Sequence, residues 1–172
     1  GTYVYLETVG GGHGARAVAD GMDGAHVHIT NSLNMPVEAV EAAYPLRVER
    51  YELIPDSGGD GEFRGGLGIA REVRALAGET TFSARADSFV TAPNGADGGL
   101  PGSHCRVIHN PGTADETVLD PKLPLLNLSP GDVVRLETPG GAGYGSPEAR
   151  APTRREADRL DGKTGRRESG AG

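Results

Sequence analysis

The stretch from Gly10 to Asn34 combines side chains that can do chemistry with a permissive backbone. Three of the five histidines lie in it, at His13, His26 and His28. Glycines fill four of the five positions 10 to 14, and glycine lets the backbone adopt unusual dihedral angles and approach a ligand or another segment closely. The stretch is therefore either the wall of an active site or an irregular structural loop.

The three histidines suggest two kinds of chemistry. His13 lies among glycines, where an imidazole could exchange a proton with a substrate or hydrogen-bond to it. His26 and His28 share one face of a strand expected over residues 25–30, so they could ligate a metal or hold the loop by hydrogen bonds to Asp20 or Asp23. Because no third ligand is evident, the structural alternative is favoured and no metal site is assigned.

The glycines also spell G-x-G-x-x-A through Gly10, Gly12 and Ala15, the outline of a dinucleotide-binding turn. That turn requires a helix to follow it directly, and the spacing between Gly14 and Gly21 is too short for one. A glycine-lined turn that touches substrate or a partner subunit is the better interpretation.

Composition sets the wider limits. The chain has 172 residues, 36% of them hydrophobic, with 28 glycines and 12 prolines, so turns are frequent and long helices few. The net charge of −7 argues against a nucleic-acid partner. Cys105 is the only cysteine, so no disulfide forms within the chain and a reducing, cytoplasmic setting fits; we predict a packing role for it. No apolar run is long enough to span a membrane.

Alternation of apolar and polar residues predicts mostly strands. We expect helices after Asn34, which could cap one, and over residues 153–160, where Thr153 and Glu156 form a capping-box pattern. The predicted fold class is α+β and β-rich, with mixed or antiparallel sheets and few short helices. Residues 1–147 would form the body, and residues 148–172 a short helix with a disordered tail. Strands are expected over residues 2–8, 25–30, 46–54 with a bulge near Arg50, 69–76, 79–86, 105–109, 116–119 and 133–138.

Long motifs resemble one family. They are YVYLETVGGGHGAR (3–16), DGMDGAHVHITNSLNMPVEAVEAAYPLRVERYELIPDSGG (20–59), FRGGLGIAREV (63–73), LSPGDVVRLETPGGAGYGSP (128–147) and EADRLDGK (156–163). In these motifs the chain resembles the carboxy-terminal part of the hydantoinase B and oxoprolinase family. The family's long amino-terminal region is not present, so we expect a piece of a longer protein.

The resemblance implies ATP-dependent hydrolytic opening of a cyclic amide such as a hydantoin or 5-oxoproline. An A-type partner subunit would bind ATP, so we expect a hetero-oligomer. ATP and a divalent metal are expected in the complete complex, and no motif of this chain binds either, because it has no P-loop. We predict that His13, His28 and Asp23 are catalytic and that the substrate-binding residues are Gly11, Gly12, Arg16, His26 and Asn31.

Three alternatives stay open at this point. The family's carboxylase branch would activate a ketone for carboxylation instead of admitting water. The chain could also be a non-catalytic assembly module, or a fragment too short to fold stably.

Overall fold

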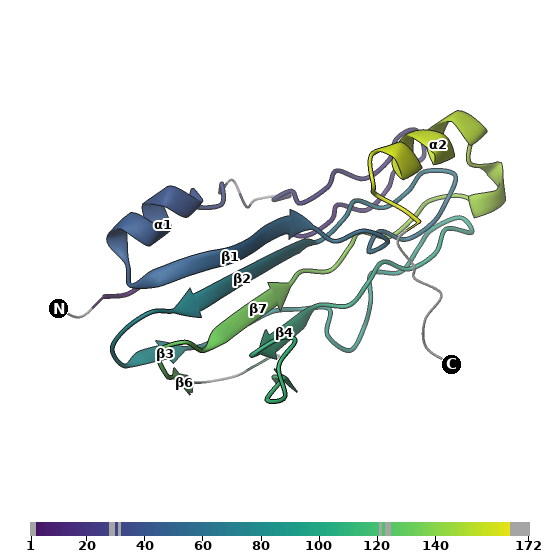
Figure 1. Cartoon of the computed structure of the whole chain (residues 1–172). Coiled ribbons are helices and arrows are strands. Elements are labelled where there is room, and N and C mark those ends of the chain that lie inside the picture. The colour runs from purple at the N-terminus through teal and green to yellow at the C-terminus, as the bar shows by residue number, and fades with distance from the viewer. Residues whose placement is uncertain (1–2, 28–29, 31, 121, 123–124, 166–172) are drawn as a thin grey trace.

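The computed structural model describes residues 3–27, 30, 32–120, 122 and 125–165. It confirms the β-rich α+β fold class, with antiparallel sheets and short helices (Figure 1). In chain order the elements are α1 (Val37–Ala43), β1 (Leu46–Leu53), β2 (Ile69–Ala75), β3 (Thr80–Phe82), β4 (Arg106–His109), β5 (Thr117–Val118), β6 (Leu126–Leu128), β7 (Val133–Glu137), the 3-10 turn η1 (Pro147–Ala149) and α2 (Pro152–Leu160).

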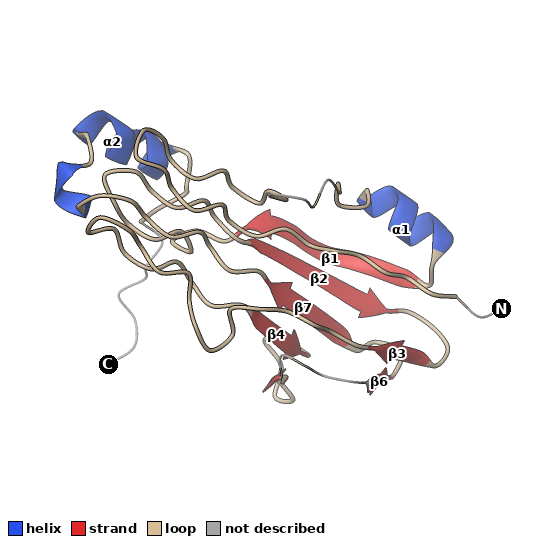
Figure 2. Ribbon diagram, turned by 180° about the vertical axis from the view of Figure 1, so that it is seen from behind, coloured by secondary structure: helices blue, strands red, loops and turns tan. Residues whose placement is uncertain are grey.

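Five strands form the main sheet in the order β1-β2-β7-β4-β5, and β3 pairs with β6 in a small second sheet. All the strand pairs are antiparallel. The register between β1 and β2 shifts between Val48 and Arg50, so the bulge expected near Arg50 is confirmed. Figure 2 shows the sheet at the end of the molecule that carries α1, and long loops leading to α2 at the other end.

The two faces of the main sheet differ in chemistry. On one face Ala75, Val107 and Val134 form a buried cluster with Leu128 of β6, so the small sheet covers this part of the core. The opposite face carries charged cross-strand neighbours, of which Glu72 Oε2 lies 2.6 Å from Arg135 Nε. Alternating side chains separate an apolar face from a charged one, as the sequence periodicity predicts.

The predicted helix after Asn34 is confirmed as α1, which buries Val40 completely. Its N-cap is Pro36, not Asn34, whose side chain instead contacts His26 and Tyr51. A proline preset to a negative φ can begin a helix without side-chain capping.

Glycine-rich segments outside the sheets pack side by side through their backbones. Segments 12–15 and 139–142 are joined by two hydrogen bonds of 2.8 Å, three residues apart on each segment. Segments 21–24 and 64–67 are joined in the same way, by bonds of 2.7 and 2.8 Å. A three-residue repeat is that of the polyproline II helix, whose backbone groups all point outward and can bond to neighbouring segments.

This packing explains why glycine is needed there. A Cβ atom on Gly12 would lie 1.9 Å from the carbonyl oxygen of Gly66, and one on Gly66 would lie 1.9 Å from that of Met22. Both distances are far inside van der Waals contact. The glycines that suggest loops in the sequence therefore build a packed layer of backbones, the glycine layer, from segments 12–15, 21–24, 64–67 and 139–142.

Several strand predictions need correction. Residues 3–8 form no hydrogen-bonded strand, and in the predicted strand 25–30 only Ala25 pairs, in an isolated bridge with Gly11, while residues 28–29 lie outside the described residues. The strand expected over 79–86 is limited to β3, and β6 was not predicted. Local periodicity indicates an extended chain, but a partner strand must also be within reach.

The second predicted helix is confirmed as α2, with a different start. Pro152 occupies the first turn, Ala151 is the N-cap without a side-chain bond, and Thr153 does not cap the helix. Glu156 instead bonds to Arg159 at 2.7 Å. The end of the tail that we expect to be disordered, residues 166–172, lies outside the described residues. In the described part of the chain, neither helix has the length and apolar character needed to cross a bilayer.

Candidate functional site

Residues 10–26 form an irregular antiparallel hairpin set into the glycine layer. Bridges join Gly11 to Ala25 near its base and Arg16 to Ala19 at its tip. Between them, His13 N–H donates to the Met22 carbonyl at 2.9 Å. The backbone of the candidate wall is therefore fixed on both sides of His13.

The side chain of His13 is set up as a proton acceptor. Its Nδ1 lies 2.5 Å from the carbonyl oxygen of Gly14. A carbonyl oxygen can only accept, so Nδ1 must carry the hydrogen, and a neutral imidazole then has its lone pair on Nε2. Within the part of the chain that the structure describes, His13 Nε2 has no hydrogen-bond partner. Its predicted catalytic role stays a prediction that this geometry allows.

His26 belongs to a short polar chain. Its Nε2 lies 3.2 Å from Asn34 Oδ1, and Asn34 Nδ2 donates to the Tyr51 hydroxyl at 2.5 Å. These contacts link the hairpin to the start of α1 and to β1. His28 and Asn31, predicted as catalytic and substrate-binding, lie outside the described residues, so the shared face of His26 and His28 stays a prediction.

Both carboxylate oxygens of Asp23 have partners. Its Oδ1 accepts from Leu67 N–H at 2.9 Å and from Arg64 Nη1 at 3.1 Å, while Oδ2 lies 3.2 Å from Lys163 Nζ. Burial alone would raise the pKa of Asp23, but the Leu67 N–H bond and the Arg64 and Lys163 charges outweigh it and lower the pKa. A carboxylate held ionised in this way can anchor the hairpin, and the catalytic role expected for Asp23 stays a prediction.

Asp23 is one part of a larger buried ion cluster. Arg64 and Arg150 are only 3% and 8% exposed. Arg150 donates to Asp20 Oδ1 at 2.7 Å and to Asp158 Oδ2 at 2.6 Å, and Arg64 Nε lies 3.4 Å from Asp158 Oδ1. The cluster therefore ties the hairpin, the segment after β1 and helix α2 together.

Sequence reasoning missed this cluster. The Asp20 and Arg150 side chains meet across 130 positions, and no local periodicity predicts such a contact. The available signal was the motif EADRLDGK, which carries Asp158 and Lys163 and belongs to the family resemblance.

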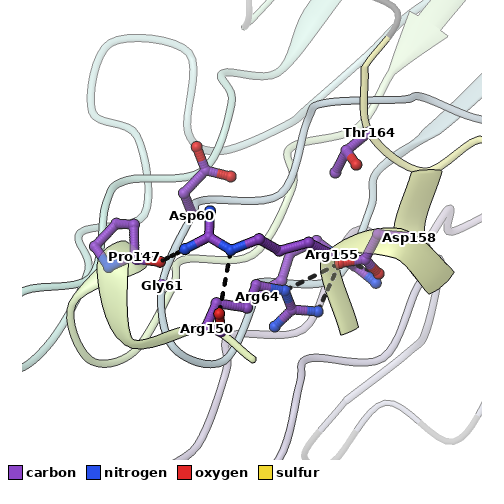
Figure 3. A pocket seen from close by; sticks show the side chains of 8 residues that line it. All are labelled: Asp60, Gly61, Arg64, Pro147, Arg150, Arg155, Asp158 and Thr164. Carbon is purple, nitrogen blue, oxygen red and sulfur yellow. Dashed lines mark hydrogen bonds and ion pairs between the residues drawn. The ribbon is translucent and has the colours of Figure 1, made fainter. Parts of the chain in front are cut away.

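A cavity of about 220 Å³ adjoins the ion cluster (Figure 3). Its guanidinium groups already have partners: Arg155 donates to the carbonyls of Arg150 and Pro147 at 3.1 and 2.5 Å. We interpret this cavity as part of the structural contact between the hairpin, the segment after β1 and α2, and not as a ligand site. It is lined by Asp60, Gly61, Arg64, Pro147, Arg150, Arg155, Asp158 and Thr164.

The other predicted substrate-binding residues have different environments. Gly12 N–H already donates to the Pro139 carbonyl at 2.8 Å, and the Gly11 carbonyl accepts from Ala25. Arg16 is exposed at the hairpin tip. Of these residues, Arg16 has the side chain that can reach a ligand, while the glycines contribute shape.

The described residues do not fit a divalent metal. No group of three or more His, Cys, Asp or Glu side chains converges among them. The metal expected in a complete complex therefore has no site built from the described side chains.

Cys105 has the predicted packing role. It is 2% exposed. Burial, with smaller contributions from Glu137 and Asp87, raises the pKa of its thiol to about 12. A thiol that stays protonated is a poor nucleophile.

Comparison with known proteins decides the family. A sequence profile of the hydantoinase B/oxoprolinase family matches residues 1–147. The chain belongs to this family. The resemblance read from the motifs is thereby confirmed.

Two relatives show how much of a longer protein this chain matches. A protein of Pseudomonas sp. (strain NS671), provisionally named as the B-type subunit of a D-/L-hydantoinase, is 39% identical over 93% of this chain and 27% of its own length. A 5-oxoprolinase of Pestalotiopsis fici is 35% identical over 91% of this chain and 12% of its own length. The chain therefore spans about a quarter or less of these relatives.

A solved structure has the same fold. The ATP-dependent caprolactamase from Pseudomonas jessenii overlays with a TM-score of 0.80 at 26% identity, over 91% of this chain and 28% of that one. The irregular glycine layer thus belongs to a fold that occurs in a larger enzyme.

Proposed function

We propose that this chain is part of a B-type subunit that opens a cyclic amide by ATP-dependent hydrolysis, together with an A-type ATP-binding subunit. The observation that carries the proposal is the family match over residues 1–147. The names of the relatives add a substrate class, since hydantoins, 5-oxoproline and caprolactam are all cyclic amides. The substrate is accordingly a small ring containing an amide bond.

Hydrolysis of such a ring needs activation. Resonance gives the amide C–N bond partial double-bond character and makes its carbonyl carbon a weak electrophile. In the proposed reaction, the A-type subunit transfers a phosphoryl group from ATP to the carbonyl oxygen. The B-type subunit then holds the activated ring while water attacks the carbon. The C–N bond breaks, the ring nitrogen leaves with a proton, and a second water hydrolyses the acyl phosphate that remains, releasing inorganic phosphate and the carboxylate.

In this scheme the hairpin of residues 10–26 forms one wall of the site. His13 Nε2 accepts a proton from the attacking water, because its Nδ1 hydrogen is committed to Gly14 O. Arg16 and His26 contact the substrate, and Gly11 and Gly12 give the wall its close approach. Asp23 acts as an anchor through Arg64 and Leu67. His28 and Asn31 remain proposed members of the same site.

The test is a His13→Gln substitution in the assembled complex, with His104→Gln at an exposed position as the matched control. Loss of a general base lowers kcat by about 10²- to 10⁴-fold, and the melting temperature should not change. Ring-opened product is measured against time at saturating ATP. A normal kcat in His13→Gln would remove His13 from the mechanism.

A further inference from the structure

The amino-terminal segment Tyr3–Gly10 differs from the strands in its backbone hydrogen bonding. Within the described part of the chain, none of its N–H or C=O groups makes a hydrogen bond. Figure 2 draws the segment as a loop that runs from the N-terminus along the sheet. Backbone N–H and C=O groups usually find partners in proteins, and among the described residues no strand pairs with this segment.

The segment is nevertheless firmly attached through one set of side chains. The Tyr3 hydroxyl lies 2.9 Å from Thr80 Oγ1, and the rings of Tyr3 and Tyr5 pack on Tyr44 with centroids 5.6 and 5.3 Å apart. Glu7 Oε2 forms a 3.0 Å ion pair with the buried Arg71. Every second residue therefore points toward the main sheet and α1, which is the alternation of a β-strand.

The intervening side chains point outward and are apolar. Val4 is 82% exposed and Leu6 is 86% exposed. Natural proteins protect exposed strand edges with charged residues, prolines or bulges. The outward positions of this segment, Val4, Leu6 and Thr8, carry none of these.

We propose that Tyr3–Gly10 is an interface strand that pairs with a β-strand from the remainder of a hydantoinase B-type subunit. Strand addition supplies backbone hydrogen bonds, and side chains on the same face of the added strand pack beside Val4 and Leu6. The inference rests on family membership and is independent of the reaction.

The length of the relatives supports this choice of occupant. The caprolactamase chain contains this fold in 28% of its length, and the hydantoinase relative matches over 27% of its own. Most of each relative therefore lies outside the part that corresponds to this chain. An apolar, unprotected strand edge is where such additional chain can be joined to this fold.

The test compares amide hydrogen exchange in the 172-residue chain with exchange in the complete B-type subunit that contains it. Amides of Val4 to Thr8 should exchange at least about 100-fold more slowly in the complete subunit, because paired amides open only by local unfolding. Equal exchange rates in the two proteins would overturn the proposal.

Substitutions give a second, independent readout in the complete subunit. The double substitution Val4→Asp and Leu6→Asp should restore fast exchange and lower the melting temperature, because it places charges in an apolar contact. The control Val90→Asp alters a side chain that is 89% exposed in a loop and should change neither. Equal effects of both changes would contradict the proposal.

The 172-residue chain alone tests a different occupant. If light scattering finds a dimer that Val4→Asp and Leu6→Asp dissociate, the strand pairs with a second copy and the proposal is wrong. A monomer at the same concentration agrees with it.

Discussion

Arg150 joins the hairpin to the carboxy-terminal helix. It bonds to Asp20 and Asp158, while its own carbonyl accepts from Arg155. Burial alone would raise the pKa of Asp20, but hydrogen bonds from the Arg150 side chain and the Arg64 N–H lower it. A carboxyl whose pKa is lowered on folding stabilises the folded state above its unfolded pKa of about 3.9, and this stabilisation is lost as the pH falls through the folded value.

Substituting Arg150 with methionine should therefore destabilise the chain and change its response to acid. Removing one partner of a buried ion cluster costs about 3 to 5 kcal/mol at neutral pH. The loss of unfolding free energy below pH 4 should also become shallower, because Asp20 no longer has its main cationic partner. Urea unfolding at pH 7 and pH 3 measures both effects.

Arg159→Met is the matched control for this change. Its ion pair with Glu156 is exposed, so its removal should leave the unfolding midpoint unchanged. If Arg150→Met also left the unfolding midpoint unchanged, the ion cluster would not hold the hairpin.

For single residues, the sequence indicates which chemistry a side chain can do better than it indicates which residues that side chain contacts. His13 is one such side chain: its Nδ1 contacts the Gly14 carbonyl oxygen, and the catalytic role expected for it stays a prediction. Asp23 was also singled out, but its Arg64 and Lys163 partners lie far away in sequence and come together only through the fold. Side-chain type can be read from a sequence, whereas its neighbours depend on tertiary packing.

Among the elements, the glycine layer holds the hairpin in place through backbone hydrogen bonds. Its segments bond to one another at three-residue intervals, so each glycine position has its own steric requirement. Gly12 and Gly14 lie in the same motif but differ in this respect. A Cβ on Gly14 would come no closer than 3.9 Å to its nearest neighbour, the Ala142 carbonyl oxygen, while a Cβ on Gly12 would overlap Gly66.

Gly12→Ala should therefore destabilise the fold by about 3 kcal/mol or more, since overpacking a tight contact forces the backbone to shift. Gly14→Ala should be neutral or stabilise by up to about 1 kcal/mol, because alanine restricts the unfolded chain at a site that has room. Thermal unfolding of the two variants checks this difference. Equal melting temperatures would mean that the layer is not tightly packed.

Elements with strong local signals were predicted well. The alternation in β1 and β2, the bulge near Arg50 and both helices could be read from the sequence. The glycine layer could not, because its regularity lies in hydrogen bonds between distant segments. Residues 3–8 had the right periodicity for a strand, but periodicity does not reveal whether a neighbour is present.

The whole molecule has two ends with different organisation. Figure 1 shows the sheet with α1 and the N-terminus at one end, and the loops with α2 at the other. The candidate hairpin lies in the loop-rich end and is tied to α2 by the ion cluster. The family motifs predict the membership of the chain, while only the structure shows that residues 3–10 have no strand partner among the described residues.

Reconstitution of the B-type subunit that contains this chain with its A-type partner tests the proposed function most directly. Hydantoin and 5-oxoproline are incubated with ATP, and the ring-opened product and ADP are measured, alongside a parallel reaction that contains a ketone and bicarbonate. We predict ring opening that requires ATP and is abolished when this chain is deleted. Carboxylation of the ketone without ring opening, or ring opening by the A-type subunit alone, would show that this chain does not belong to a cyclic-amide hydrolase.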